Sequence, residues 1–213
     1  MLIGIVGHLK RAEQARALQK NTRAAFVSLD NGSMGCEANH RRVWEWLNAH
    51  KAQHDWLIVL EDDATPCTGF VDQLSQALQH APAPIVSLYA GRERPPQYQF
   101  ALERAVALAE AEDASWMTSR VLMHAVAVAI RAELVADLLT GLAWSHLPID
   151  EAINSWAAAR HNRVAYAQPS PVDHADGETL IQHRDGQPRP PGRIAWRHGT
   201  RTEWTGRQVI MSI

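Results

Sequence analysis

Short apolar runs alternate with stretches of helix-forming residues through the first half of the chain. This alternation limits the possible folds more than any other feature. The apolar runs cover 2–6, 25–29, 56–60 and 85–89, and helix formers fill 9–20, 34–50 and 69–78. Apolar strands separated by helices are typical of a mostly parallel sheet with helices on both faces. The sequence therefore predicts an α/β fold.

The second half continues this pattern less regularly. Helices are expected at 102–111, 131–142 and 149–161, and a strand is expected at 121–130. The polar stretch 91–99 predicts a surface loop, which is open to interpretation as a mobile lid or as a plain connector. Ser33 and Thr68 are expected to cap the helices that follow them.

Composition narrows the class of protein. The chain has 213 residues, and with 46% of them hydrophobic and 21% charged it suits a single folded domain over 1–213. A net charge of -2 excludes a uniformly basic nucleic-acid binder, although a local basic face stays possible. Cys36 and Cys67 are too few for a disulfide framework or a four-cysteine zinc site. Because no apolar run approaches the ~18 residues of a membrane span, we expect a cytoplasmic protein without an integral membrane segment.

Three adjacent acids, Glu61, Asp62 and Asp63, follow the apolar strand at 56–60. Ligands of open α/β sheets gather beyond the carboxyl ends of the strands, and adjacent carboxylates repel each other unless a cation lies among them. Hard oxygen ligands suit Mg²⁺ or Mn²⁺. The alternative is a solvated acidic turn in which one acid caps the next helix.

Two segments resemble a known family. Residues 59–64, Val-Leu-Glu-Asp-Asp-Ala, resemble the acidic motif of metal-dependent glycosyltransferases with the nucleotide-diphospho-sugar (GT-A) fold. Residues 34–45, Met-Gly-Cys-Glu-Ala-Asn-His-Arg-Arg-Val-Trp-Glu, are similar to the Gly-Cys-x-x-x-His segment of glycosyltransferase family 25, the lipooligosaccharide and collagen galactosyltransferase group. The order and spacing of the two segments also match this family.

The resemblance implies a metal and donor site. It implies Mn²⁺ or Mg²⁺ held by three residues: Asp63, Asp62 and His174. It implies a nucleotide-sugar donor, with UDP-sugar favoured, bordered by six residues: Gly7, His8, Asp30, His40, Arg41 and Asp62. For His40 and Arg41 the alternative is a histidine packed against the sheet and a solvated arginine. His174 belongs to residues 169–174, which are similar to a segment that returns a histidine to the metal in several GT-A enzymes.

Residues 147–154 resemble the late acidic motif that opens a helix near the acceptor in GT-A enzymes. An inverting transferase needs a carboxylate to take the proton of the attacking hydroxyl, since a neutral hydroxyl is a weak nucleophile. Asp150 or Glu151 could supply it, and Asp150 is preferred because it lies closer to the strand end. The alternative is that these acids serve only the helix dipole.

The chain divides into three functional parts under this interpretation. Residues 1–90 form the nucleotide-sugar-binding half, 91–177 the acceptor-side half, and 178–213 a loop-rich basic C-terminal extension. The extension carries six arginines and two tryptophans: Arg184, Arg189, Arg193, Arg197, Arg201, Arg207, Trp196 and Trp204. These side chains suit a diphosphate clamp, an anionic acceptor, or a solvated tail with one or two donor contacts.

The sequence thus favours a metal-dependent glycosyltransferase. It would move a sugar to an acceptor hydroxyl on a glycan, a protein or a modified nucleic acid, with inversion. A metal-dependent nucleotidyl or phosphoryl transferase is one alternative, although the chain lacks the Gly-x-x-x-x-Gly-Lys loop of many ATP-using enzymes. A non-catalytic module that binds glycan or nucleic acid is the other.

Overall fold

The computed structural model describes residues 1–177, 180 and 191–213. Its strands are β1 (Leu2–His8), β2 (Phe26–Asp30), β3 (Trp56–Glu61), β4 (Ala64–Pro66), β5 (Ile85–Ser87), β6 (Trp116–Ser119), β7 (Ala127–Arg131), β8 (Val164–Ala167), β9 (Val172–His174) and β10 (Gln208–Ile210). Its α-helices are α1 (Ala12–Thr22), α2 (Cys36–Ala49), α3 (Phe70–Gln79), α4 (Pro96–Ala111), α5 (Val135–Leu142) and α6 (Ile149–Ala159). Two 3-10 helices, η1 (Leu9–Arg11) and η2 (Ala132–Leu134), precede α1 and α5.

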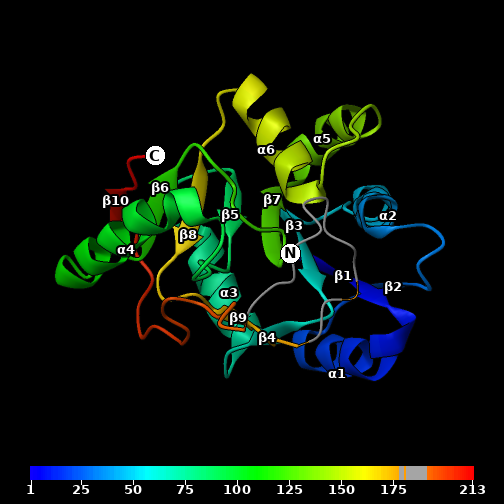
Figure 1. Ribbon diagram of the computed structural model, residues 1–213, viewed down its shortest axis with the longest axis horizontal. Coiled ribbons are helices and arrows are strands. Elements are labelled where there is room, and N and C mark those ends of the chain that lie inside the picture. The colour runs from blue at the N-terminus through cyan, green and yellow to red at the C-terminus, as the bar shows by residue number, and fades with distance from the viewer. Residues whose placement is uncertain (178–179, 181–190) are drawn as a thin grey trace.

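Eight strands form one sheet in the order β10-β6-β8-β5-β7-β3-β1-β2 (Figure 1). β7 runs antiparallel to both of its neighbours, β3 and β5, and β6 runs antiparallel to β8. The other neighbouring pairs are parallel. The predicted α/β class with a mostly parallel sheet is confirmed.

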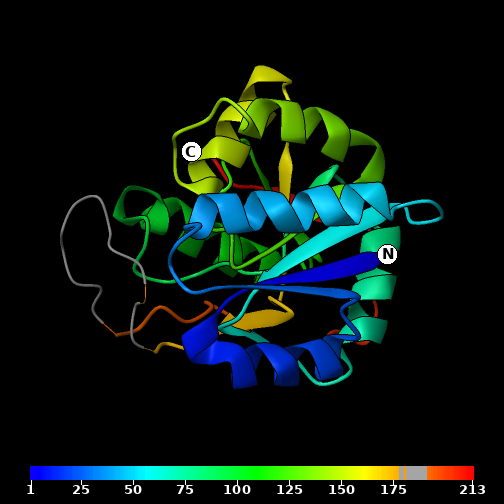
Figure 2. The ribbon, with the colours of Figure 1, turned by 90° about the vertical axis from the view of Figure 1, so that its right-hand side faces the viewer.

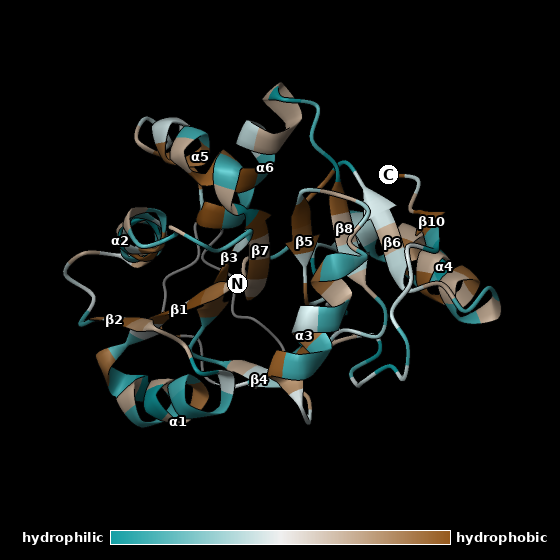
Figure 3. Cartoon of the chain, turned by 180° about the vertical axis from the view of Figure 1, so that it is seen from behind, coloured by the Kyte–Doolittle hydropathy of each residue, from teal (hydrophilic) through white to brown (hydrophobic). Residues whose placement is uncertain are grey.

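Helices cover both faces of the sheet, as the apolar strands require. Residues of α2, α4, α5 and α6 join one hydrophobic cluster, and residues of α1 and α3 join a second cluster on the other face. Figure 2 shows α2 and α1 on opposite sides of β1. Figure 3 shows hydrophobic residues along the central strands and hydrophilic residues on the outer sides of α1 and α2. The core is therefore two apolar layers separated by the sheet.

Two predicted helix caps are wrong. Ser33 does not cap α2, because the chain turns at Gly35, the N-cap residue, with φ +88°. Thr68 does not cap α3, because Gly69 occupies the N-cap position in the left-handed conformation. Glycine adopts positive φ without the steric cost that a side chain would add, so a backbone turn takes the place of a hydroxyl cap.

Several predicted boundaries also move. The expected loop at 91–99 is shorter, because α4 already begins at Pro96, where proline is favoured in a first helical turn. The expected strand at 121–130 is confined to β7, and β6 precedes it. Residues 91–94 pack on the C-terminal part of the chain: Arg92 N–H donates to the Ile194 carbonyl over 2.9 Å. This contact fits the plain-connector interpretation of the loop.

The described C-terminal residues contribute to both sheets and cover one end of the molecule. β10 lies parallel to β6 at the edge of the main sheet, and β9 pairs with β4 in a separate two-stranded sheet. Arg184, Arg189 and the rest of 181–190 lie outside the described residues. Within the described ranges, none of the helices has the length and apolar character needed to cross a bilayer.

Candidate functional site

The acid trio lies where β1 and β3 end side by side, since Val6 is paired with Glu61 in the parallel register. Arg11, in the 3-10 turn directly after β1, provides the cation that the acids require. Its Nη1 lies 3.0 Å from Asp62 Oδ1 and 2.7 Å from Asp63 Oδ2. The sheet edge therefore carries a charge cluster in which a guanidinium bridges two carboxylates.

Asp62 is held from both sides. Its Oδ2 accepts the His8 N–H over 2.7 Å, while Oδ1 accepts from Arg11. A Cβ at Gly7 would lie 3.3 Å from the Asp62 carboxylate and 2.9 Å from a methyl of Leu29, so glycine permits the close approach of β1. Burial raises the pKa of Asp62 despite these hydrogen bonds. Because both of its carboxylate oxygens already accept hydrogen bonds, Asp62 is arranged to orient His8 and Arg11.

Asp63 meets His174 across the small sheet. β4 pairs with β9 so that Ala64 lies opposite His174, and this register brings His174 Nε2 to 3.4 Å from Asp63 Oδ2. Burial alone would raise the pKa of Asp63, but the hydrogen bonds and charges of His174 and Arg11 outweigh it and lower that pKa. Asp63 Oδ1 and His174 Nδ1 are both buried without a hydrogen-bond partner in the described part of the chain. A carboxylate and an imidazole can both ligate a divalent ion, and the carboxylate is the ligand type that Mn²⁺ and Mg²⁺ prefer.

Glu61 belongs to a second group. His40 is buried on α2, and its Nε2 lies 3.0 Å from Glu61 Oε1. Burial opposes charging of the imidazole, but interactions with Cys36 and Glu61 raise the pKa of His40 to about 10. Cys36, His40 and Glu61 offer ligand atoms that all lie within 4.8 Å of one another, so this group could hold a metal ion.

Asp150 and Glu151 open α6, as the sequence predicts for acids in a first helical turn. Burial raises the pKa of Asp150 to about 6, and the nearby charge of Glu61 adds to this effect. Its Oδ1 accepts the Glu151 N–H over 2.9 Å. Glu151 itself is exposed. Asp150 is thus the acid of this pair that lies within electrostatic reach of the strand end.

The remaining predicted donor residues occupy different surroundings. Asp30, buried after β2, accepts the N–H groups of Gly32, Met34 and Gly35, and it organises the turn that leads into α2. These backbone hydrogen bonds outweigh desolvation and lower the pKa of Asp30. Arg41 is exposed and forms a 3.6 Å ion pair with Glu45 on the same helix.

His8 lies at the end of β1, where its Nδ1 accepts the Lys10 N–H over 3.1 Å. Buried His40 and exposed Arg41 fit the alternative expectation for these two residues, namely a histidine packed against the sheet and a solvated arginine. The structure brings Gly7, His8, Asp62, Asp63 and His174 into one group, while Asp30 serves the neighbouring turn.

Sequence reasoning missed three residues beside this site: Arg11, Tyr89 and His124. Tyr89 packs between two imidazoles, with ring centroids 5.0 Å from His124 and 6.2 Å from His174. Burial lowers the pKa of His124 to about 4, and the charge of His174 acts in the same direction. The acid trio itself signalled a missing cation, and Arg11 lies just after the neighbouring strand end. Nothing in the sequence pattern signalled His124.

The described arginines of the C-terminal segment bind the protein itself. Arg201 donates to the carbonyl oxygens of Ala114 and Gln168, and Arg193 forms a 3.2 Å ion pair with Asp176. Arg197 pairs with Glu110, and Arg207 donates to the Glu112 carbonyl. These guanidiniums attach the segment to the rest of the fold.

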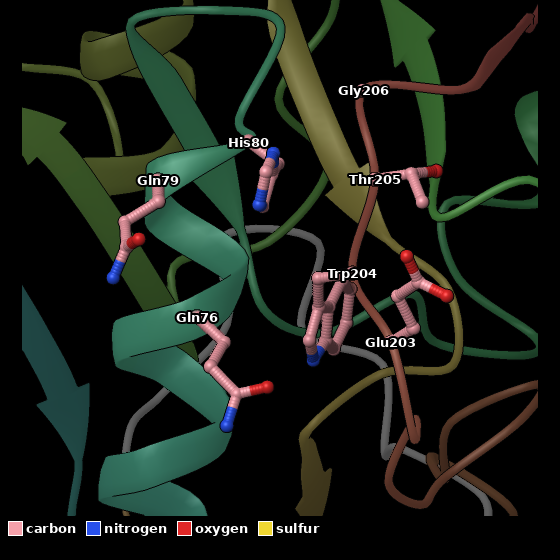
Figure 4. A pocket seen from close by; sticks show the side chains of 7 residues that line it. All are labelled: Gln76, Gln79, His80, Glu203, Trp204, Thr205 and Gly206. Atoms are coloured by element: carbon pink, nitrogen blue, oxygen red, sulfur yellow. The ribbon is translucent and has the colours of Figure 1, made fainter.

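A hollow of about 310 Å³ lies between α3 and 203–206, away from the acid cluster (Figure 4). Its lining includes Gln76, His80 and Trp204. The Trp204 indole N–H donates to Gln73 Oε1 over 3.0 Å, and the ring packs on Trp116. The hollow therefore lies along the contact between the C-terminal segment and α3.

No protein-family model matches the chain, and no curated protein sequence matches it. The chain is similar to the solved structure described as "Crystal Structure of A197 from STIV", with 10% identity, coverage of 95% of this chain and 98% of that chain, and a TM-score of 0.51. At this identity the likeness shows the fold alone.

A second solved structure is described as a glycosyltransferase involved in the glycosylation of the major capsid of PBCV-1. It matches at 8% identity over 71% of this chain and 72% of that chain, with a TM-score of 0.35. A match this distant carries no argument about the site. The similarity to the first structure therefore shows a shared fold and no more.

Proposed function

We propose that this protein is a metal-dependent glycosyltransferase that moves a sugar from a nucleotide-diphosphate donor, UDP-sugar being favoured, to an acceptor hydroxyl. The observation that carries the proposal is that Asp63, between β3 and β4, and His174, in β9, lie 3.4 Å apart although they are distant in the chain. With Arg11 beside them, they form a charged site at the edge of an α/β sheet where ligands commonly bind.

Asp63 and His174 would hold Mn²⁺ or Mg²⁺, because His174 Nε2 and Asp63 Oδ2 face each other over 3.4 Å and Asp63 Oδ1 has no hydrogen-bond partner in the described ranges. The ion would neutralise charge on the departing diphosphate. Asp62 would orient Arg11 and the end of β1, and His8 would border the donor with Gly7. Asp30, His40 and Arg41 stay in the proposal as residues around the donor half, 1–90.

Asp150 would act as the base on the acceptor side, within 91–177. As the acceptor oxygen forms its bond to the anomeric carbon, the bond from that carbon to the diphosphate oxygen breaks, and the hydroxyl proton passes to the Asp150 carboxylate. A pKa of about 6 leaves this carboxylate ionised at neutral pH yet basic enough to take the proton. Attack opposite the leaving group inverts the anomeric configuration. Glu151, being exposed, is the second choice.

Arg11 would stay next to the site throughout the reaction. Its guanidinium carries positive charge at all relevant pH values and can pair with phosphate oxygens as well as with carboxylates. The Asp62 and Asp63 carboxylates hold it at the end of β1, so little reorganisation is needed when a diphosphate arrives. The acceptor, on a glycan, a protein or a modified nucleic acid, would enter on the Asp150 side.

A panel of nucleotide sugars tests the proposal. The protein is incubated with each donor and Mn²⁺, and released nucleotide is measured. We expect release from at least one donor, and its loss in Asp63→Asn and in chelator. The control is Glu103→Gln, which changes an exposed acid on α4. Equal activity in Asp63→Asn and Glu103→Gln would contradict the proposal. In a thermal-shift assay, stabilisation of the protein by ATP but by none of the nucleotide sugars would favour the nucleotidyl transferase.

A further inference from the structure

A second group of ligating side chains lies on the opposite flank of the acid trio. Cys36 is the first residue of α2, His40 follows one turn later, and Glu61 ends β3. Their ligand atoms lie within 4.8 Å of one another. Around a tetrahedral ion with bonds of ~2.0–2.3 Å, ligand atoms are about 3.5 Å apart. Small side-chain rotations would therefore let all three reach one ion.

The buried imidazole of this group has an incomplete set of hydrogen bonds. His40 is 1% exposed, and its Nε2 is engaged with Glu61. Its Nδ1 is buried and has no hydrogen-bond partner within the ranges that the structure describes. A buried polar atom without a partner costs free energy, so such atoms are usually satisfied by protein, water or an ion. The His40 imidazole, which shares its cluster with the Cys36 sulfur, therefore has incomplete hydrogen bonding within the described ranges.

We propose that Cys36, His40 and Glu61 form a binding site for a borderline divalent metal ion of the Zn²⁺ class. Sulfur, nitrogen and oxygen donors suit Zn²⁺ or Co²⁺, whereas Mn²⁺ and Mg²⁺ prefer oxygen. Cys36 is the first residue of α2, a helix of 14 residues, and its sulfur is one of the three clustered ligand atoms.

Three protein ligands leave one tetrahedral position open to water or to a bound molecule. The ion would tie the start of α2 to the end of β3, next to Asp150. This site does not depend on the proposed transferase activity, because it shares no ligand with the Asp63 and His174 pair.

Cobalt provides a direct test, because Co²⁺ replaces Zn²⁺ and reports a thiolate ligand as a charge-transfer band in the near-ultraviolet. The apoprotein, prepared with chelator and reductant, is titrated with Co²⁺ and then with Zn²⁺. We expect the band to saturate at one ion per chain and to vanish on addition of Zn²⁺. Cys36→Ser and Glu61→Gln should lose the band or bind much more weakly.

Two controls separate this site from the rest of the molecule. Cys67→Ser removes the other cysteine, which is buried outside the group, and should keep the band. Asp63→Asn should also keep it, so failure of the transferase proposal leaves this test intact. Far-ultraviolet circular dichroism verifies that each variant folds. Absence of a thiolate band in the folded wild type, or an unchanged band in Cys36→Ser, would overturn the proposal.

Alkylation gives a second readout that does not depend on cobalt. Iodoacetamide should modify Cys36 in the apoprotein, and Zn²⁺ at ten times its dissociation constant should slow that reaction about tenfold. An unchanged rate would show that Zn²⁺ does not protect the Cys36 sulfur and would overturn the metal site. Peptide mapping assigns the label to Cys36 or Cys67.

Discussion

At the scale of single residues, the charge cluster at the end of β3 depends on Arg11. One guanidinium compensates two carboxylates, and removal of one partner from a partly buried group leaves the others uncompensated. The guanidinium was not foreseen, because its partners lie far along the chain and only the parallel pairing of β1 with β3 brings them together. The acids themselves could be predicted, since they end an apolar strand.

We expect Arg11→Gln to lower the free energy of unfolding by about 2 kcal/mol, because two charge-assisted hydrogen bonds are lost while Asp62 and Asp63 stay in place. Urea unfolding at neutral pH measures the change. Arg16→Gln is the matched control, since Arg16 is exposed on α1 and should shift stability by less than about 0.5 kcal/mol. Similar small shifts in both variants would show that the bridge contributes little.

His124 predicts a pH dependence of stability. Burial lowers its pKa in the folded state to about 4, below the ordinary 6.5, so the unfolded chain binds the proton more readily. Its contribution is therefore complete above pH 6.5 and is lost as the pH falls from 6.5 toward 4, by at most about 1.4 kcal/mol per pH unit.

The measurement compares wild type with His124→Gln by urea unfolding between pH 4 and pH 7. The variant should lose less stability on acidification, because it has no imidazole to protonate at this position. Exposed His198 supplies the control: His198→Gln should leave the slope unchanged. A slope in His124→Gln identical to that of the wild type would refute the assignment.

At the scale of elements, the sequence predicted long elements better than short ones. β1, β2 and β3 are predominantly apolar, and this hydrophobicity marks them as strands in the sequence. β9 and β10 have three residues each, and their pairing partners, β4 and β6, lie far away in the sequence. Strands this short carry no periodic signal, so tertiary pairing decides them.

The attachment of the C-terminal segment gives an element-scale prediction. Trp204 is 3% exposed and packs on Trp116 beside α3, so Trp204→Ala should cost about 3–5 kcal/mol through lost burial and a cavity. Trp144 is 85% exposed, and Trp144→Ala should change stability by less than about 0.5 kcal/mol. Thermal or urea unfolding compares the two. An equally small loss of stability in both variants would mean that the contact between the C-terminal segment and α3, shown in Figure 4, adds no stability.

At the scale of the whole molecule, the proposed site joins distant parts of the chain. His8 ends β1 and donates its N–H to Asp62, which follows β3, and β9 brings His174 to the adjacent Asp63. The sequence predicted that His174 would lie near Asp63, and the 3.4 Å distance shows that it does. A metal role for the pair stays a prediction. The sequence could not foretell the packing of Tyr89 and His124 around His174, which follows from tertiary contacts alone.

The most direct test of this account is the Mn²⁺ dependence of UDP binding, measured by isothermal titration calorimetry in the wild type, His174→Ala and His198→Ala. We predict that UDP binds the wild type and His198→Ala tightly only with Mn²⁺, and that His174→Ala loses affinity by about tenfold or more, since loss of a ligand acts mainly on the bound state. Unfolding midpoints of the two variants without metal should differ far less. Metal-independent UDP binding, or equal metal-dependent affinity in His174→Ala and His198→Ala, would contradict the account.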